Sequence, residues 1–207
     1  MRLAAILLSL AIIMINGAPS FADAIPARAK KYRALLVREA RMAWGMGAPV
    51  ATFAAQIHQE STWKEGARSH AGAEGLAQFM PATARWLPTV SPRTGEPVPY
   101  SPSWAIRAML EYDKYLWKNV PPAASDCDRW AFVLSAYNGG LGWLRRDCSL
   151  AAEYGLDAAR WDGVRIVNAG RSARNFDENR GYPERILRRW TPVYREAGWG
   201  RGGCDDR

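Results

Sequence analysis

The sequence predicts a mainly α-helical protein with at most a very small β element. Apolar residues recur at three- and four-residue spacing in most segments. No β-hairpin signal and no sustained alternation of apolar and polar residues occurs. The 207 residues are 48% hydrophobic and 23% charged, which is typical of a globular protein. At this length the chain can bury a full core as one domain.

The N-terminal segment predicts export. Arg2 precedes an apolar run over residues 3–15, and small residues precede a cleavage point after Ala22. The run is too short to cross a bilayer, which takes roughly 20 residues. We therefore expect residues 1–22 to be a cleaved signal peptide, with an uncleaved anchor as the alternative. The mature chain is expected to be periplasmic or secreted, in the cell envelope.

Three helical segments are expected in the first half of the mature chain. Residues 29–46 and 49–61 each carry apolar side chains on one helical face, and glycines separate them. Residues 76–87 form the third segment, in which Pro81 suits a first helical turn better than an interior. The five prolines of residues 88–102 predict an ordered surface loop.

The second half is expected to be helical for most of its length. Ser103 caps a long helix that extends to Trp117, and Asp128 caps the next helix, over residues 130–137. Further helices are expected over residues 141–147, 157–162 and 183–197. We expect residues 23–200 to form a single domain and residues 201–207 to form a flexible tail.

Net charge and cysteine content narrow the class of binding partner and the disulfide bonds to be expected. The net charge of +8 predicts a partner of opposite sign, and for an exported chain an anionic cell-wall polymer or a membrane surface suits better than nucleic acid. Three cysteines are too few for a disulfide scaffold. A bond between Cys127 and Cys148 would add about 3 kcal/mol and leave Cys204 unpaired. The sequence permits any of the three pairings, or none.

Glu60 is the residue best placed for catalysis. Position 62 is Thr, so His58 lacks the second histidine of a zinc-binding helix, and neither a Gly-rich phosphate loop nor a plausible Ser-His-Asp set occurs. We expect no metal and no cofactor. Glu60 ends an apolar helix, where desolvation would raise the pKa of its carboxyl as a general acid requires. A solvated glutamate that helps to end the helix is the alternative.

Four blocks of sequence follow one another along the chain. Residues 55–61 end in Glu-Ser, residues 69–84 contain Gly-Leu-Ala-Gln-Phe-Met, residues 136–140 read Ala-Tyr-Asn-Gly-Gly, and residues 178–187 begin Glu-Asn-Arg-Gly-Tyr. In this order they resemble the soluble lytic transglycosylase (SLT) domain of the lysozyme superfamily, over residues 33–190. The resemblance implies a lysozyme-like fold, with helices around a glycan-binding cleft.

The resemblance also implies a reaction. Glu60 would protonate the glycosidic oxygen between N-acetylmuramic acid (MurNAc) and N-acetylglucosamine (GlcNAc), and would then act as a base. No obvious second carboxyl lies near it in the sequence, so the N-acetyl oxygen and 6-hydroxyl of MurNAc would attack instead, leaving a 1,6-anhydro end. The residues implied to bind the glycan are Ser61, Ser69, Gln78, Met80, Tyr137, Asn138, Glu178 and Tyr182.

Several alternatives stay open at this point. A muramidase that uses water, or a non-catalytic peptidoglycan-binding assembly factor, would share these blocks. Tyr137 and Glu178 can instead have structural roles, and Trp63, Trp86, Trp104 and Trp143 can be core residues rather than sugar platforms. The expected partner is the peptidoglycan glycan strand, with an envelope-spanning secretion, conjugation or phage apparatus as a further candidate. We expect a monomer, no nucleic acid, and membrane contact only through the signal segment.

Overall fold

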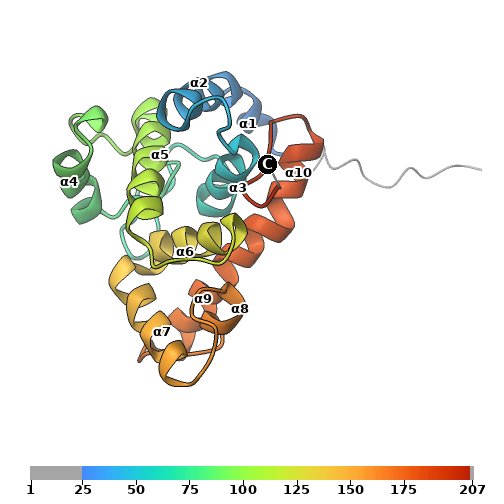
Figure 1. Cartoon of the computed structure of the whole chain (residues 1–207). Coiled ribbons are helices and arrows are strands. Elements are labelled where there is room, and N and C mark those ends of the chain that lie inside the picture. The colour runs from blue at the N-terminus through green and yellow to red at the C-terminus, as the bar shows by residue number, and fades with distance from the viewer. Residues whose placement is uncertain (1–24, 206–207) are drawn as a thin grey trace, which may run out of the picture.

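The computed structural model describes residues 25–205, which fold into packed helices (Figure 1). Within these residues the β structure amounts to two isolated bridges, which join Glu74 to Arg68 and to Phe79. The predicted fold class is therefore confirmed. The expected signal peptide, residues 1–22, lies outside the described residues. The helices, in chain order, are α1 (Ala27–Lys30), α2 (Arg33–Trp44), α3 (Val50–Ser61), α4 (Pro81–Val90), the 3-10 helix η2 (Pro92–Thr94), α5 (Pro102–Asn119), α6 (Asp126–Gly139), α7 (Leu141–Glu153), α8 (Trp161–Val164), α9 (Ala173–Glu184), the π-helical turn η3 (Arg185–Trp190) and α10 (Thr191–Glu196).

Helix α3 lies at the centre of the fold. Ten of its twelve residues are buried, and α2, η3 and α10 pack around it (Figure 1). The helix ends because Thr62 takes a left-handed backbone conformation, with φ of 52°. Burial on nearly all sides therefore fixes the position of the helix end that carries Glu60.

Helix α6 lies between two groups of helices, α2 to α5 in one half of the molecule and α7 to α9 in the other (Figure 1). It packs against α5 on one side and against α7 and α9 on the other (Figure 1). All of its residues from Trp130 to Ala136 are buried. Because α6 touches both halves, its C-terminal end can present side chains between them.

The start of two helices differs from the prediction. Helix α6 begins earlier than expected, at Asp126, because the hydroxyl of Ser125 accepts a hydrogen bond from the backbone N–H of Asp128. Asp128 therefore lies in the first turn instead of capping the helix. Helix α5 begins at Pro102, so Ser103 is likewise inside the helix. Each difference is a shift within one helical turn.

The expected third and last helices also differ. Residues 76–78 form turns and the helix begins only at Pro81, because Gln78 has a left-handed backbone and Phe79 bridges to Glu74. Helix α9 was not predicted, since most of its residues are polar or charged. It continues through η3 into α10, so residues 183–197 are the end of a longer helical segment.

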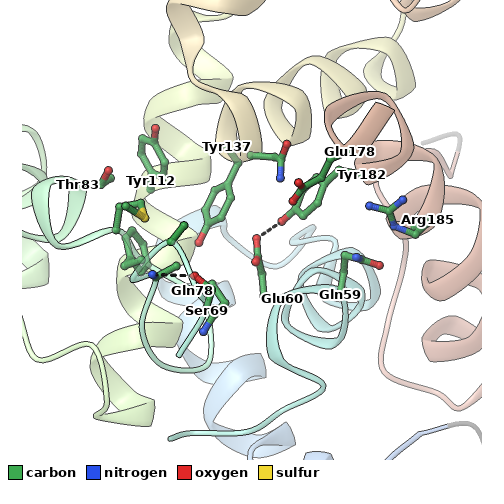
Figure 2. Close-up of a pocket in the computed structure, with 15 residues that line it drawn as sticks. Gln59, Glu60, Ser69, Gln78, Thr83, Tyr112, Tyr137, Glu178, Tyr182 and Arg185 are labelled. Carbon is green, nitrogen blue, oxygen red and sulfur yellow. Dashed lines mark hydrogen bonds between the residues drawn. The ribbon is translucent and has the colours of Figure 1, made fainter. Parts of the chain in front are cut away.

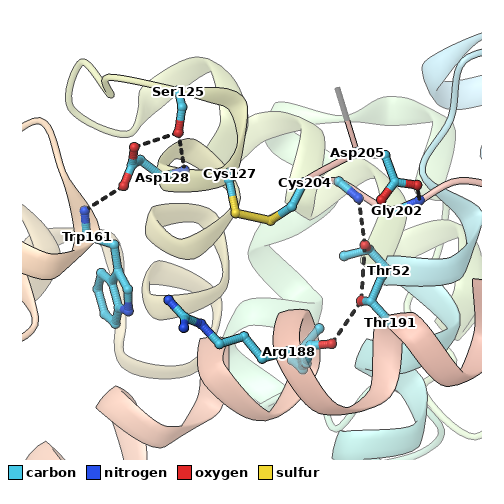
Figure 3. The surroundings of a disulfide bond; sticks show 12 residues. Thr52, Ser125, Cys127, Asp128, Trp161, Arg188, Thr191, Gly202, Cys204 and Asp205 are labelled. Carbon is cyan, nitrogen blue, oxygen red and sulfur yellow. Dashed lines mark hydrogen bonds between the residues drawn. A yellow bond between two sulfur atoms is a disulfide. The ribbon is translucent and has the colours of Figure 1, made fainter. Parts of the chain in front are cut away.

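The disulfide joins Cys127 to Cys204 (Figure 3). Cys148 is a buried free thiol. Of the pairings that the sequence left open, the structure therefore has Cys127–Cys204, and the bond between Cys127 and Cys148 is not formed. The chain after α10 turns back onto the N-terminal ends of α6 and α3. Cys204 is bonded to Cys127 of α6, and the backbone N–H of Gly203 donates to the hydroxyl of Thr52 of α3 at 2.9 Å. Residues 201–205, expected to be part of a flexible tail, are instead packed against the domain and covalently attached to it.

Candidate active site

A cleft of about 350 Å³ opens between the C-terminal end of α3, the loop that follows it, and helices α5, α6 and α9 (Figure 2). Its walls are mostly polar, and Glu60 projects into it. The residues that line it are Gln59, Glu60, Ser69, Ala71, Ala73, Gln78, Phe79, Met80, Thr83, Tyr112, Tyr137, Asn138, Glu178, Tyr182 and Arg185.

Glu60 is a partly buried carboxyl whose oxygen Oε1 accepts a hydrogen bond from the hydroxyl of Tyr182 (Figure 2). The pKa of Glu60 is raised to about 8, chiefly by burial; the hydrogen bond from Tyr182 opposes this rise, and the nearby charge of Glu178 adds to it. The carboxyl therefore holds its proton at neutral pH. A neutral acid in an open cleft can donate a proton to an oxygen of a bound ligand.

Tyr182 reaches Glu60 because α9 is docked tightly on α6. The side chain of Asn179, buried between the two helices, accepts from the hydroxyl of Ser135 at 2.9 Å and donates to its carbonyl at 2.9 Å. Gly139 permits this approach, since a Cβ there would lie 2.5 Å from Nδ2 of Asn179. Asn179 lies within the fourth sequence block, but its role in positioning depends on a partner 44 residues away.

A buried ion cluster holds α9 and the segment before it in place. Asp147 of α7 is fully buried, and its Oδ2 accepts hydrogen bonds from Arg171 and, at 2.8 Å, from Arg180. Arg180 also donates to the carbonyl of Val167 at 2.8 Å. These contacts orient α9 so that Tyr182 faces the cleft.

The loop after α3 is shaped by its own hydrogen bonds. Gly75 has φ of 75°, and a Cβ there would lie 1.9 Å from the carbonyl oxygen of Pro99, so only glycine fits. The amide of Gln78 donates to the Gly75 carbonyl at 2.9 Å, and the hydroxyl of Tyr137 donates to the Ala77 carbonyl at 2.7 Å. Tyr137 thus ties the loop to α6 and also forms part of the cleft wall.

The cleft contains eight of the nine residues singled out from the sequence. They are Glu60, Ser69, Gln78, Met80, Tyr137, Asn138, Glu178 and Tyr182. Ser61 does not line the cleft; its buried hydroxyl donates to the carbonyl of Leu76 at 2.8 Å and supports the loop. The sequence analysis did not identify Gln59, Thr83, Tyr112 or Arg185 as lining residues, because helical spacing alone does not show which face meets the cleft.

The four tryptophans considered as sugar platforms lie within the described residues, and none of them lines this cleft. Trp63 and Trp104 belong to the core. Trp86 is partly exposed and packs edge-on against Tyr115. The ring of Trp143 lies 3.7 Å from the guanidinium carbon of Arg146. The core interpretation therefore holds for two of the four.

His58 points away from the cleft. Its Nδ1 lies 2.9 Å from the hydroxyl of Tyr194, and its ring stacks on Trp190 at 3.8 Å. Burial and, to a lesser extent, the charge of Arg189 lower its pKa to about 4. Across residues 25–205, no cluster of three or more His, Cys, Asp or Glu side chains is placed to hold a metal ion. Over the same residues, no helix has both the length and the apolar composition to cross a membrane.

Solved structures define the class of protein. The chain matches a 70 kDa soluble lytic transglycosylase, solved as a complex with bulgecin A, with a TM-score of 0.62 and 25% identity over 84% of this chain and 26% of that one. It matches an inactive glutamate-to-glutamine mutant of the lytic transglycosylase Slt from Pseudomonas aeruginosa with a TM-score of 0.60 and 25% identity, over 84% and 25% of the two chains. The domain therefore has the helical lysozyme-like fold.

Sequence comparison defines the family. The sequence model of the Transglycosylase SLT domain matches residues 39–157, more than half of the chain, and the chain belongs to this family. A membrane-bound lytic murein transglycosylase F from Shewanella denitrificans is 33% identical over 115 residues, which are 56% of this chain and 22% of that protein. The chain spans about a quarter of the length of the relatives it matches. Glu178 and Tyr182 lie beyond the residues matched by the family model.

Proposed function

We propose that the protein is a lytic transglycosylase that cleaves the β-1,4 bond between MurNAc and GlcNAc in peptidoglycan and leaves a 1,6-anhydro-MurNAc end. The observation that carries this proposal is Glu60, a carboxyl with its pKa raised to about 8 at the centre of an open, polar cleft. Membership of the SLT family and the names of its relatives support the choice of substrate.

The reaction begins with proton transfer from Glu60 to the glycosidic oxygen. The bond between C1 of MurNAc and that oxygen breaks, and GlcNAc leaves with a free 4-hydroxyl. The N-acetyl oxygen of the same MurNAc bonds to C1 and holds the positive charge. The 6-hydroxyl then displaces the N-acetyl oxygen at C1 and gives its proton to the Glu60 carboxylate. Glu60 ends in its starting state, and no water is consumed.

Tyr182 has two roles in this scheme. Its hydroxyl orients Glu60, and it stabilises the carboxylate that exists between the two proton transfers. Burial raises the pKa of Tyr182 well above its ordinary value, and the Glu60 charge raises it further, so it stays a donor throughout. Ser69, Gln78, Met80, Asn138 and Glu178 are proposed glycan contacts, from their places along the cleft wall.

Product analysis tests the proposal. Mature protein incubated with cell-wall sacculi should release 1,6-anhydromuropeptides, detected by mass spectrometry. Glu60→Gln should lower the rate by about 100-fold or more, the lower end for loss of a general acid. Glu65→Gln, the same substitution at a carboxyl outside the cleft, is the control. Reducing-end products would favour a water-using muramidase, and sacculus binding without products would favour an assembly factor.

We also propose that the chain acts in the cell envelope, after cleavage of residues 1–22. The apolar run of that segment and the presence of relatives named as membrane-bound support this location. N-terminal sequencing of the exported protein tests the cleavage point. A monomeric state, an envelope-spanning apparatus as a partner, and the absence of nucleic-acid binding remain predictions.

A further inference from the structure

Asp113 of α5 is a further buried carboxyl, located behind the cleft. It is fully buried and accepts one hydrogen bond, from Nε2 of Gln56 to Oδ1, at 3.2 Å. Among the ion pairs formed within residues 25–205, none includes Asp113. No cation therefore offsets the cost of a negative charge at this position.

Two oxygens of this pair are buried and have no hydrogen-bond partner among the residues that the structure describes. They are Oδ2 of Asp113 and Oε1 of Gln56. An ionised carboxylate can only accept hydrogen bonds, whereas a carboxylic acid also has one donor. A proton on Oδ2 that is donated to Oε1 of Gln56 would close a cyclic pair with two hydrogen bonds. One proton would thus satisfy both oxygens.

The pair is joined to the candidate active site through α3. Gln56 and Glu60 are four residues apart, so their side chains lie on the same face of the helix. Burial raises the pKa of Asp113 well above its ordinary value, the Gln56 hydrogen bond lowers it, and the charge of Glu60 raises it.

Within residues 25–205, the titratable groups that interact electrostatically with Asp113 carry no positive charge. They are Glu60 of α3, Tyr112 of α5, Tyr137 of α6 and Tyr182 of α9. In each of the three tyrosines burial raises the pKa, so they remain neutral phenols. Ionisation of Asp113 would therefore place a second negative charge beside Glu60 without compensation.

We propose that Asp113, protonated and paired with Gln56, is a positioning residue of the Glu60 site. The acid–amide pair holds the face of α3 that carries Gln56 and Glu60 against α5, and so fixes the direction in which Glu60 projects. Because Asp113 is neutral, it adds no further negative charge to that of Glu178 while Glu60 loses and regains its proton. This role rests on the proposed function of Glu60, but the protonation state of Asp113 does not.

Infrared difference spectroscopy tests the protonation state without any activity. A protonated carboxyl has a C=O stretching band distinct from that of a carboxylate. At neutral pH the Glu60→Gln variant should show the acid C=O band of Asp113. The double variant Glu60→Gln/Asp113→Asn should lack that band. Identical spectra in the acid C=O region would overturn the proposal, whether or not the protein cleaves peptidoglycan.

Activity on sacculi tests the positioning role. Asp113→Asn keeps a neutral hydrogen-bonded pair, so the rate and the basic limb of the pH–rate profile should be unchanged. A basic limb moved to lower pH would show that Asp113 is charged in the native protein, because removal of that charge lowers the pKa of Glu60. The exposed Asp177→Asn is the matched control.

Two further variants separate positioning from folding. Asp113→Leu leaves Gln56 without a partner and should lower the rate by about 10- to 100-fold; a native rate would overturn the proposal. The exchanged pair Gln56→Glu/Asp113→Asn conserves both side-chain shapes and the single proton, so it should be active even if Asp113→Leu does not fold. A folded but inactive exchanged pair would refute positioning by the acid–amide pair.

Discussion

Replacement of Glu60 by glutamine should stabilise the folded protein at neutral pH while it removes the proposed acid. The pKa of Glu60 is raised from 4.5 to about 8 by burial. Below pH 4.5 the carboxyl is protonated in both the folded and the unfolded state, so its titration does not affect stability. Between pH 4.5 and 8 the unfolded chain releases the proton and the folded protein keeps it. Each pH unit in this window therefore favours unfolding by about 1.4 kcal/mol.

At pH 7 the accumulated cost is about 3 kcal/mol, and above pH 8 it levels off near about 5 kcal/mol. Glutamine does not titrate and avoids this cost. Urea unfolding of wild type and Glu60→Gln at pH values of about 4, 6 and 8 should show a stability difference that grows with pH. A difference that is the same at all three pH values would refute the raised pKa.

Glu65→Gln provides a control in which the change in stability at neutral pH has the opposite sign. The hydroxyl of Tyr32 and the ammonium of Lys31 hold the pKa of this exposed carboxyl below its ordinary value. Its stabilising contribution is present above that ordinary value and is lost as the pH falls. Glu65→Gln should therefore be less stable than wild type at neutral pH, and the difference should shrink toward acid pH.

Three further perturbations test other parts of the structure. Tyr182→Phe removes a hydrogen bond that lowers the pKa of Glu60, so the basic limb of the pH–rate profile should move to higher pH; an unchanged limb would contradict that coupling. The double variant Cys127→Ser/Cys204→Ser removes the disulfide between residues 77 apart and should lower the free energy of unfolding by about 4 kcal/mol. Reductant should lower the stability of the wild type and leave that of the variant unchanged. Equal stabilities of the two proteins would argue against the bond. Asp147→Asn leaves two buried arginines without their carboxylate and should cost about 3–5 kcal/mol in urea unfolding, whereas a loss below about 1 kcal/mol would mean that water or other groups replace it.

The helices that hold the centre of the fold could be predicted from the sequence. Helix α3 matches its predicted range, residues 49–61, to within one residue, because apolar side chains at three- and four-residue spacing mark a buried helix. The same reasoning placed Glu60 at the end of an apolar helix, and its pKa is raised by burial as expected. Helix α9 could not be found in this way, since its polar side chains bind Asp147 and Ser135 instead of forming an apolar face.

The sequence by itself determined the fold class, the acidic residue at the end of α3 and, through four ordered blocks, the family. Each of these depends on local spacing or local order along the chain. Only the tertiary structure decided that Tyr182, 122 residues away, binds Glu60, that Cys127 pairs with Cys204, and that Asp113 lies behind the cleft. These contacts depend on which helix faces meet, and that is set by packing of the whole core.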